Sequence, residues 1–514
     1  MIVQKICKNR FLFLFLFAFG IRLLVILLIH EPGYMDTSYY AVQGIQFAEG
    51  AGAQEPYIWN YLSVSETIPG PAFHYWMPMP ALLAAPFWVI GRSFEVMQIP
   101  FALLSVLLIV LGAHLAWTIA RNERHFWTAG LLLTFCGTVT PFLTLPETFA
   151  PFAFFGAICL WLSGRYWQTT KVYLIVAAVI ASVLAYLTRS DGLLLVMLVL
   201  VLPLLRHKVM AFLVVITTVA VSLAPWCVYN LQNHHYLLPT SGTKTLWLTT
   251  YDDLYCYQCD LSIHTYWQWG WTAILHSKLK AAVNNIMILI FNLGFISFTP
   301  LAIVGGWQIR KRPEFVVAWS YLLLLFLTMT LAFTFPSSRG SLMHSLAALL
   351  PFAVVAIVVG LDVVVVWASK KRGWNTQQAQ IVFSVGALVV AVVITVNALK
   401  DNLLIWKDAN LLYHQAGQWL DDHAQTSCPV LVSDPPSFWY ITRVPALVVP
   451  NENPATLRQV AQRYDACWLL LDPNRPYPLQ DLYDSGQADG WRLVHSWTHG
   501  KLFRFIAGES TTGL

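Results

Sequence analysis

The sequence predicts a polytopic α-helical membrane protein with a small α/β domain at its C-terminal end. Of its 514 residues, 57% are hydrophobic and only 11% are charged, and the mean hydropathy is +0.59. Charged residues make up about 25% of a soluble domain, so this composition excludes an ordinary soluble globule. The apolar residues gather in runs long enough to cross a bilayer, and charged residues return after residue 400. We therefore expect a transmembrane module at residues 1–400 and a separate domain at residues 401–514.

Apolar runs of roughly 17 to 25 residues predict about eleven membrane spans. The first run does not end in the small residues of a signal-peptide cleavage site, so we expect it to remain as a permanent span. The expected spans are residues 11–30, 98–120, 126–143, 148–163, 173–187, 192–205, 210–229, 283–307, 315–334, 346–367 and 380–399.

Every second connection between these spans is short and basic, which predicts the orientation of the chain. The basic segments are the N-terminus, with Lys5, Lys8 and Arg10, and residues 121–125, 164–171, 206–208, 309–312 and 370–372. The positive-inside rule places them in the cytoplasm, so an odd number of spans places the C-terminal domain outside. We expect the plasma membrane, which in a bacterium is the inner membrane. The formal net charge of +5 includes no basic patch, which argues against nucleic-acid binding.

The first outer loop, residues 31–97, contains an apolar segment that is broken by proline and too short to span, PMPALLAAPFWVIGRSF. Such a segment favours a helix that lies in the membrane interface with its apolar face toward the lipid. A short re-entrant packing segment is the alternative.

Short apolar runs between Pro, Asp and Asn predict buried strands in the C-terminal domain. The expected strands are residues 429–433, 446–450 and 467–472, and helical periodicity is found in residues 410–423 and 454–464. Helices that alternate with strands indicate an α/β domain. No GxGxxG motif follows a strand, so we expect no nucleotide cofactor there.

Two acidic residues at the outer ends of expected spans are candidate catalytic residues. Asp36 follows the turn at Pro32 and Gly33, and its ionised carboxylate is costly to hold so close to hydrocarbon. Glu147 lies in the tight reversal TLPETF at the same surface. The alternatives are a solvated loop acid for Asp36 and, for Glu147, an acid that stabilises the N-terminus of the next helix. Together, Asp36 and Glu147 predict a shared cavity that could hold a divalent cation.

Four basic side chains at other outer reversals are candidate phosphate ligands. Arg339 and His344 lie in FPSSRGSLMHSLAALLP, where a guanidinium beside a helix N-terminus suits a phosphate. Arg189 lies in LTRSDGLL, where a local salt bridge with Asp191 is the alternative, and Lys244 lies in PTSGTKTLW. For Arg339 the alternative is snorkelling toward the lipid headgroups.

Two further features have competing interpretations. Arg22 lies in the middle of the first span, where a charge indicates either a function or a structural pair with carbonyl groups of a neighbouring helix. Cys256 and Cys259, with His264 nearby, could bind zinc, although one CxxC pair without a second is a weak signal. The spacing of the eight cysteines predicts no disulfide framework.

The order of these motifs resembles the GT-C glycosyltransferase superfamily, which includes the protein O-mannosyltransferases and the aminoarabinose transferases of lipid A. The resemblance rests on YMDTSYYAVQGIQFAEG, the proline-rich segment, LPETFAPF and LTRSDGLL, and more loosely on residues 339–351. It implies that Asp36 is the catalytic base and that Glu147 lies near the donor phosphate or a metal ion. Thr37 follows Asp36 where the mannosyltransferases typically have Glu, and the Trp-Trp-Asp signature of oligosaccharyltransferases is absent.

The resemblance implies a transferase that moves a sugar from a polyprenyl-phosphate donor to an acceptor outside the cytoplasm. Asp36 would take the proton of the acceptor hydroxyl, and Arg339 or Arg189 would hold the departing phosphate. One carboxylate acting as base, without a nucleophile, predicts direct displacement with inversion. The expected partners are the lipid-linked donor, membrane lipids and a lipid, glycan or protein acceptor.

Two other classes of protein compete with this interpretation. One is a transporter or flippase of lipid-linked sugars, which usually has two similar halves and polar groups near the middle of the bilayer. No internal repeat is found, and most of the notable charges lie at outer reversals. The other is a polymerase or ligase of surface polysaccharides.

Overall fold

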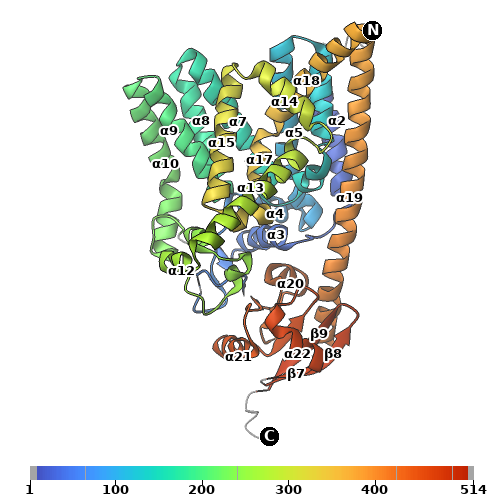
Figure 1. The fold of residues 1–514 in the computed structure, drawn as a ribbon. Helices are drawn as coiled ribbons and strands as arrows, with labels where there is room; N and C mark the ends of the chain where they lie inside the picture. The colour runs from blue at the N-terminus through green and yellow to red at the C-terminus, as the bar shows by residue number, and fades with distance from the viewer. Residues whose placement is uncertain are drawn as a thin grey trace.

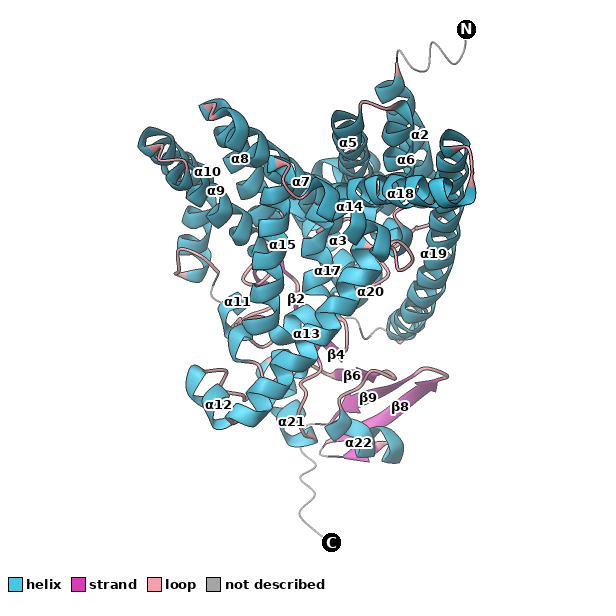
Figure 2. Cartoon of the chain, turned by 45° about the horizontal axis from the view of Figure 1, so that its top comes forward, coloured by secondary structure: helices cyan, strands magenta, loops and turns pink. Residues whose placement is uncertain are grey.

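The chain forms a bundle of long helices that carries a small strand-containing domain at one end. The computed structural model describes residues 9–63, 65–239, 241–423, 425, 427–488 and 490–506. Figure 1 shows the helices packed side by side, with the N-terminus at the opposite end of the bundle from the C-terminal domain. Figure 2 shows the longer strands gathered at the domain end. The predicted fold class is therefore confirmed.

The long helices follow most of the predicted spans. They are α2 (Arg10–Ile26), α5 (Phe94–Ala120), α6 (Glu123–Thr134), α7 (Phe149–Thr169), α8 (Val172–Thr188), α9 (Leu193–Leu205), α10 (Val209–His234), α13 (Trp271–Leu293), α14 (Thr299–Ile309), α15 (Pro313–Leu331), α18 (Leu350–Arg372) and α19 (Thr376–Asp422). Among the described residues, six helical segments are long and apolar enough to cross a membrane, or seven if α6 and the bent 3-10 helix η1 (Gly137–Thr144) form one span. The chain is thus a multi-pass membrane protein. The predicted count of eleven is not confirmed, in part because α2 and α8 have only 17 residues each.

The prediction of a single span at residues 283–307 is wrong, because the chain breaks there into two helices. Between α13 and α14, Phe295 and Ile296 have positive φ angles of 44° and 63°. α14 then packs closely on α18, where a Cβ added at Gly305 would lie 1.8 Å from the carbonyl oxygen of Ala356. The absence of a side chain at Gly305 therefore permits the close packing of these two helices.

Arg22 has the structural role that was one of its two interpretations. The side chain is completely buried, and its guanidinium donates hydrogen bonds to Ser105 Oγ (2.8 Å) and to the carbonyl oxygens of Thr134 (2.9 Å) and Leu133 (3.4 Å). α6 ends at Thr134, so its last carbonyl groups lack partners within the helix. Arg22 satisfies two of them and links α2, α5 and α6.

The first outer loop forms two helices, α3 (Met35–Ala48) and α4 (Met79–Gly91). Figure 1 shows α3 lying crosswise to the long helices, at the end of the bundle that faces the C-terminal domain. On α4, Ala81 and Ala84 are buried, whereas Val89 and Ile90 are 63% and 76% exposed. This apolar exposed end agrees with the predicted helix in the membrane interface.

The C-terminal domain is built on a seven-stranded sheet with the order β2-β5-β4-β6-β9-β8-β7. Its strands are β2 (Tyr57–Ile58), β4 (Val430–Val432), β5 (Ala446–Val448), β6 (Trp468–Leu471), β7 (Gln487–Ala488), β8 (Trp491–Trp497) and β9 (Gly500–Phe505), and its helices are α20 (Pro435–Thr442), α21 (Pro454–Arg463) and α22 (Gln480–Ser485). β5, β4 and β6 are parallel and buried, which confirms the three predicted strands. The antiparallel strands β7, β8 and β9 are not among the predicted elements.

Two elements join this domain to the transmembrane module. β2 belongs to the first outer loop and pairs in parallel with β5 at the edge of the sheet. α19 runs as one helix of 47 residues, and its end is the predicted helix 410–423. The boundary between residues 400 and 401 lies inside α19 and stays a prediction.

Two disulfides form at the domain end of the chain, Cys256–Cys259 and Cys428–Cys467. The first uses both thiols of the CxxC motif, so the zinc interpretation of that motif is wrong. The second links the segments that lead into β4 and β6. Cys7 lies outside the described residues, and Cys136, Cys159 and Cys227 are free thiols.

We predict that Arg22→Ala destabilises the bundle by about 2–5 kcal/mol, because two buried carbonyl groups lose their donor. The measurement is the thermal unfolding of the purified protein in detergent, followed by circular dichroism. Lys400→Ala truncates an exposed side chain of α19 and serves as the control, with an unchanged transition expected. An Arg22→Ala protein as stable as this control would contradict the structural role.

Candidate active site

Three reversals of the chain meet around one cavity at the domain end of the bundle. They are the start of α3, the turn between α8 and α9, and the turn formed by α16 (Thr334–Pro336), the π-helix η5 (Ser337–Ser341) and α17 (Leu342–Leu346). The cavity has a volume of about 330 Å³. Four of the six predicted site residues line it: Asp36, Arg189, Arg339 and His344.

Asp36 lies in the first turn of α3, where the helix dipole favours a negative charge. Its carboxylate borders the cavity and has no ion pair among the described residues. Burial raises the pKa of Asp36 above its usual range; His344 and Arg189 act in the opposite direction, and Glu147 adds to the rise. Asp36 is therefore a carboxylate that faces a cavity and is available to accept a proton.

Arg189 forms the local salt bridge that was its alternative interpretation, and it also borders the cavity. Its guanidinium pairs with Asp191 at 3.1 Å, which is the predicted local salt bridge. It also donates to Thr148 Oγ1 (3.3 Å) and to the carbonyl oxygen of Ser341 (3.4 Å), and it lines the cavity. Ser345 donates a hydrogen bond to Asp191 in turn. These contacts tie the turn between α8 and α9 to the start of α7 and to the turn at η5 and α17.

Glu147 lies behind the cavity and does not line it. Its side chain is completely buried, and its carboxylate accepts hydrogen bonds from the backbone N–H groups of Thr148 (2.9 Å) and Phe149 (3.2 Å) at the start of α7. His344 Nδ1 lies 3.3 Å from Glu147 Oε2, and the His344 ring stacks on Phe149 with centroids 4.0 Å apart. Glu147 thus has the helix N-terminal position that was its alternative interpretation, and it orients His344.

The predicted divalent cation at Asp36 and Glu147 stays a prediction. The two carboxylates influence each other electrostatically, but Glu147 already accepts two backbone N–H groups. The part of the chain that the structure describes contains no group of three or more His, Cys, Asp or Glu side chains placed to hold a metal ion. These donors are therefore a poor fit to such an ion.

The two remaining basic candidates differ in position. Arg339 is 62% exposed, lies over the Tyr251 ring at 5.0 Å, and has a nitrogen 3.9 Å from Asp252 Oδ1. Lys244 instead donates a hydrogen bond to the carbonyl oxygen of Leu62 and does not line the cavity. The structure therefore does not bring Lys244 to the predicted phosphate site.

Solved structures match the chain over most of its length, although no protein-family model and no curated protein sequence does. The crystal structure of ArnT from Cupriavidus metallidurans in the apo state matches with a TM-score of 0.58 and 14% identity, over 98% of this chain and 99% of that one. The archaeal oligosaccharyltransferase AglB from Archaeoglobus fulgidus, in complex with an inhibitory peptide and a dolichol-phosphate, gives 0.51 and 11%, over 91% and 70%. A crystal structure of the Archaeoglobus fulgidus oligosaccharyltransferase with Zn and sulfate gives 0.54 and 13%, over 95% and 73%.

The chain has the GT-C fold. Its identity to these proteins is below 15%, so they establish the fold, and any activity has to be argued from the residues of this chain. Two walls of the cavity were not predicted from the sequence.

One wall of the cavity is aromatic. Trp59 and Trp76 are stacked with centroids 4.0 Å apart, and Tyr75 lies edge-on to Trp59 at 5.2 Å. All three line the cavity, and Trp59 Nε1 is buried without a hydrogen-bond partner among the described residues. Rings of this kind stack on sugars through their faces, and a free N–H can donate to a hydroxyl group. The signal in the sequence was two aromatic clusters in the first outer loop, YIWNY and FHYWM.

The other wall is apolar and partly exposed. It is formed by Leu193, Leu194, Leu238, Met329 and Phe333, of which Leu193 and Leu238 are 41% and 39% exposed. Within a membrane these leucines would face acyl chains. The cavity of this GT-C fold therefore has a charged floor, an aromatic wall and a side that is open to lipid.

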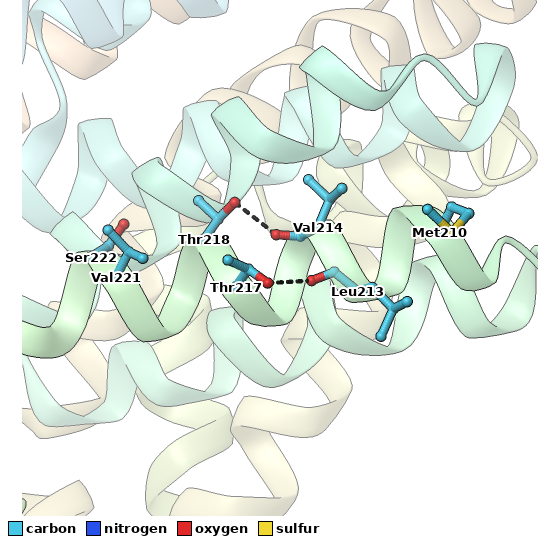
Figure 3. A pocket seen from close by; sticks show the side chains of 7 residues that line it. All are labelled: Met210, Leu213, Val214, Thr217, Thr218, Val221 and Ser222. Atoms are coloured by element: carbon cyan, nitrogen blue, oxygen red, sulfur yellow. Dashed lines mark hydrogen bonds between the residues drawn. The ribbon is translucent and has the colours of Figure 1, made fainter.

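A hollow on the surface of α10 has neither the charged residues nor the aromatic wall of this cavity. It is lined by Met210, Leu213, Val214, Thr217, Thr218, Val221 and Ser222 (Figure 3). The hydroxyl groups of Thr217 and Thr218 donate to the carbonyl oxygens of Leu213 (2.9 Å) and Val214 (2.8 Å) of the same helix (Figure 3). This surface has no charged side chain and reads as a lipid-facing groove.

Proposed function

We propose that this protein is a membrane glycosyltransferase that moves a sugar from a polyprenyl-phosphate donor to an acceptor hydroxyl on the extracytoplasmic side. The observation that carries the proposal is the single cavity in which Asp36 faces Arg189, Arg339 and His344 beside an apolar opening. A lipid-phosphate sugar has matching parts: an acyl-like tail, an anionic phosphate and a hydroxyl-rich ring. The AglB structure with the same fold was solved with a dolichol-phosphate, which supports this class of donor.

In the proposed reaction Asp36 acts as the general base. Its carboxylate takes the proton of the acceptor hydroxyl while the acceptor oxygen attacks the anomeric carbon of the sugar. The bond between that carbon and the phosphate oxygen breaks, and polyprenyl phosphate leaves with the electron pair. The other carboxylate that lines the cavity, Asp191, is paired with Arg189, so no unpaired carboxylate among the described lining residues is left to act as a nucleophile. The proposed displacement is therefore direct and inverts the anomeric centre.

Basic groups on the cavity wall hold the leaving phosphate in this proposal. Arg339 is the stronger candidate for direct contact, because its guanidinium is mostly exposed and only weakly paired with Asp252. Arg189 is already paired with Asp191, so it contributes charge from a fixed position. His344 is held by Glu147 and Thr148 and faces the same space.

The disulfides support the proposed orientation. Cys256–Cys259 and Cys428–Cys467 belong to the same end of the molecule as the cavity. Disulfides persist outside the cytoplasm and are rare inside it. Together with the positive-inside pattern of the connections, this supports a position of the C-terminal domain and the cavity on the extracytoplasmic face of the plasma membrane.

We predict that Asp36→Asn lowers sugar transfer about 10²- to 10⁴-fold, the usual contribution of a general base. The substitution keeps the shape of the side chain, so donor affinity should change little. The assay is transfer of radiolabelled sugar from a polyprenyl-phosphate donor by the purified protein in vesicles. Asp481→Asn, at an exposed site on α22, is the matched control. Transfer at the normal rate by Asp36→Asn would show that Asp36 is not the base. If the protein were instead a flippase, it would move the donor across the vesicle membrane without consuming it.

Arg339→Ala should raise the donor KM about threefold to tenfold, a range reduced because the side chain is largely exposed. Lys244→Ala should leave the donor KM unchanged, since Lys244 is bonded to Leu62 away from the cavity. Arg492→Ala, at an exposed site on β8, controls for the loss of a surface charge. The reverse result, with Lys244→Ala affecting the donor KM and Arg339→Ala not, would refute the proposed phosphate site.

The rate of transfer should fall as the pH is lowered, because only the ionised carboxylate of Asp36 is a base. Burial raises the pKa of Asp36, so half of the activity should be lost at a pH clearly above 4, where a free Asp titrates. The measurement is kcat/KM for the donor from about pH 4 to about pH 9, with thermal unfolding followed at each pH as the control for stability. A rate that stays constant down to about pH 4 would contradict the buried position of the base.

A further inference from the structure

A second and larger cavity, which we call the seam cleft, lies between the C-terminal domain and the bundle. It has a volume of about 1140 Å³ and is lined by the start of the first outer loop, the second half of α19 and the C-terminal domain. Pockets for drug-sized ligands measure about 300–1,000 Å³, so the seam cleft has room for several sugar rings. The donor and the catalytic residues of the proposed transfer reaction do not occupy the seam cleft.

The seam cleft lies at the carboxyl ends of the three parallel strands. Asp434 follows β4, Asn451 follows β5 and Asp472 follows β6, and all three residues line the cleft. Ligands of α/β sheets bind at the carboxyl ends of the strands, because the loops there carry side chains toward a common space. The position of the cleft is therefore that of a ligand site and not of an accidental gap between domains.

The seam cleft borders the cavity that contains Asp36. Arg339 lines both of them, Tyr34 of the cleft lies two residues before Asp36, and the charge of Asp36 contributes to the raised pKa of Asp434. A molecule held in the cleft can thus reach Asp36 with one of its groups. The acceptor of the transfer reaction has to approach in this way.

The charges of the seam cleft select the kind of molecule that fits. Asp252 is paired with Arg339, but Asp408, Asp434 and Asp472 take part in none of the ion pairs of the described residues. Arg475, the other arginine of the cleft, lies beside Asp472 and donates to its carbonyl oxygen, so its charge compensates only one of these acids. An anionic ligand would face these acids without enough compensating positive charge.

The remaining groups of the seam cleft suit a saccharide. Tyr477 is 88% exposed at the cleft, so the face of its ring is available to a ligand. Burial raises the pKa of Asp434 to about 7, so this carboxyl group can accept or donate hydrogen bonds. Sugars present hydroxyl groups to such side chains and C–H faces to aromatic rings.

We propose that the seam cleft binds the acceptor, and that the acceptor segment held there is a saccharide chain without phosphate or carboxylate groups. The inference rests on the proposed transferase function and adds the class of its acceptor. Asp408, Asp434 and Asp472 accept hydrogen bonds from the hydroxyl groups, and Tyr477 stacks on a ring. The end of the chain then presents one hydroxyl to Asp36.

The test measures the acceptor KM of the full-length protein, with host-cell membranes as the source of acceptor and a saturating amount of radiolabelled polyprenyl-phosphate sugar. The variants are Asp408→Asn combined with Asp472→Asn, and Tyr477→Ala. We expect the acceptor KM of both variants to be about tenfold higher than that of the wild type. The double Asp variant loses hydrogen bonds to charged groups, and Tyr477→Ala loses a stacking surface. Asp481→Asn should leave it unchanged, since Asp481 is exposed outside the cleft.

Two results would overturn the inference. A lower acceptor KM in the double Asp variant would show that the acids repel an anionic acceptor, and an unchanged KM in all variants would show that the acceptor binds elsewhere. Two controls are measured in each variant, the donor KM and the slow hydrolysis of the donor to free sugar. Both depend on the donor cavity and should not change. A wild-type protein that consumes no donor would refute the transferase proposal itself, whereas normal donor consumption with an unchanged acceptor KM refutes only the seam cleft as the acceptor site.

Discussion

The structure depends on the mutual compensation of charges at one end of an apolar bundle. Arg189 is half-buried and paired with Asp191, and the buried carboxyl group of Glu147 accepts hydrogen bonds from two backbone N–H groups and lies 3.3 Å from His344. An uncompensated charge in such a position costs several kcal/mol, so the reversals that carry these residues have to meet. Asp36 and Asp191 both line the cavity, and of these two only Asp36 has no ion pair among the described residues. The contacts that join the outer ends of α7, α8 and α17 therefore leave an unpaired carboxylate on the wall of the cavity.

Charges were predictable from the sequence where the surrounding residues are apolar. Asp36, Arg189 and His344 stand out because each interrupts or directly follows an apolar run, and all three line the cavity. Lys244 lies in the polar loop 230–280, where a charge carries no such information, and its ammonium group is bonded to a carbonyl oxygen. The location of Glu147 was predictable, but the direction of its side chain was not. The backbone angles of one short turn decide whether this side chain faces the cavity or the N-terminus of α7.

Other features could not be predicted because they depend on contacts between distant parts of the chain. β2 has two residues, too few for a recognisable period, and it becomes a strand only by pairing with β5 almost 400 residues later. The break between α13 and α14 lies in a run of apolar residues that has the pattern of one span, and the positive φ angles of Phe295 and Ile296 interrupt the helix there. The stacking of Trp59 on Trp76 could not be predicted either, because the sequence has 22 tryptophans and does not show which of them are in contact.

The pairing of β2 with β5 also explains how two cavities can serve one reaction. β2 ends at Ile58, directly before Trp59 of the aromatic wall, and β5 ends at Val448, which lines the seam cleft. One short ladder thus sets the distance between the ring that would hold the donor sugar and the floor that would hold the acceptor. Inversion requires the acceptor oxygen to approach the anomeric carbon from the side opposite the departing phosphate. In the proposed reaction, the two cavities that Arg339 lines, one with an exposed apolar side and one bordered by the C-terminal domain, would supply these two directions.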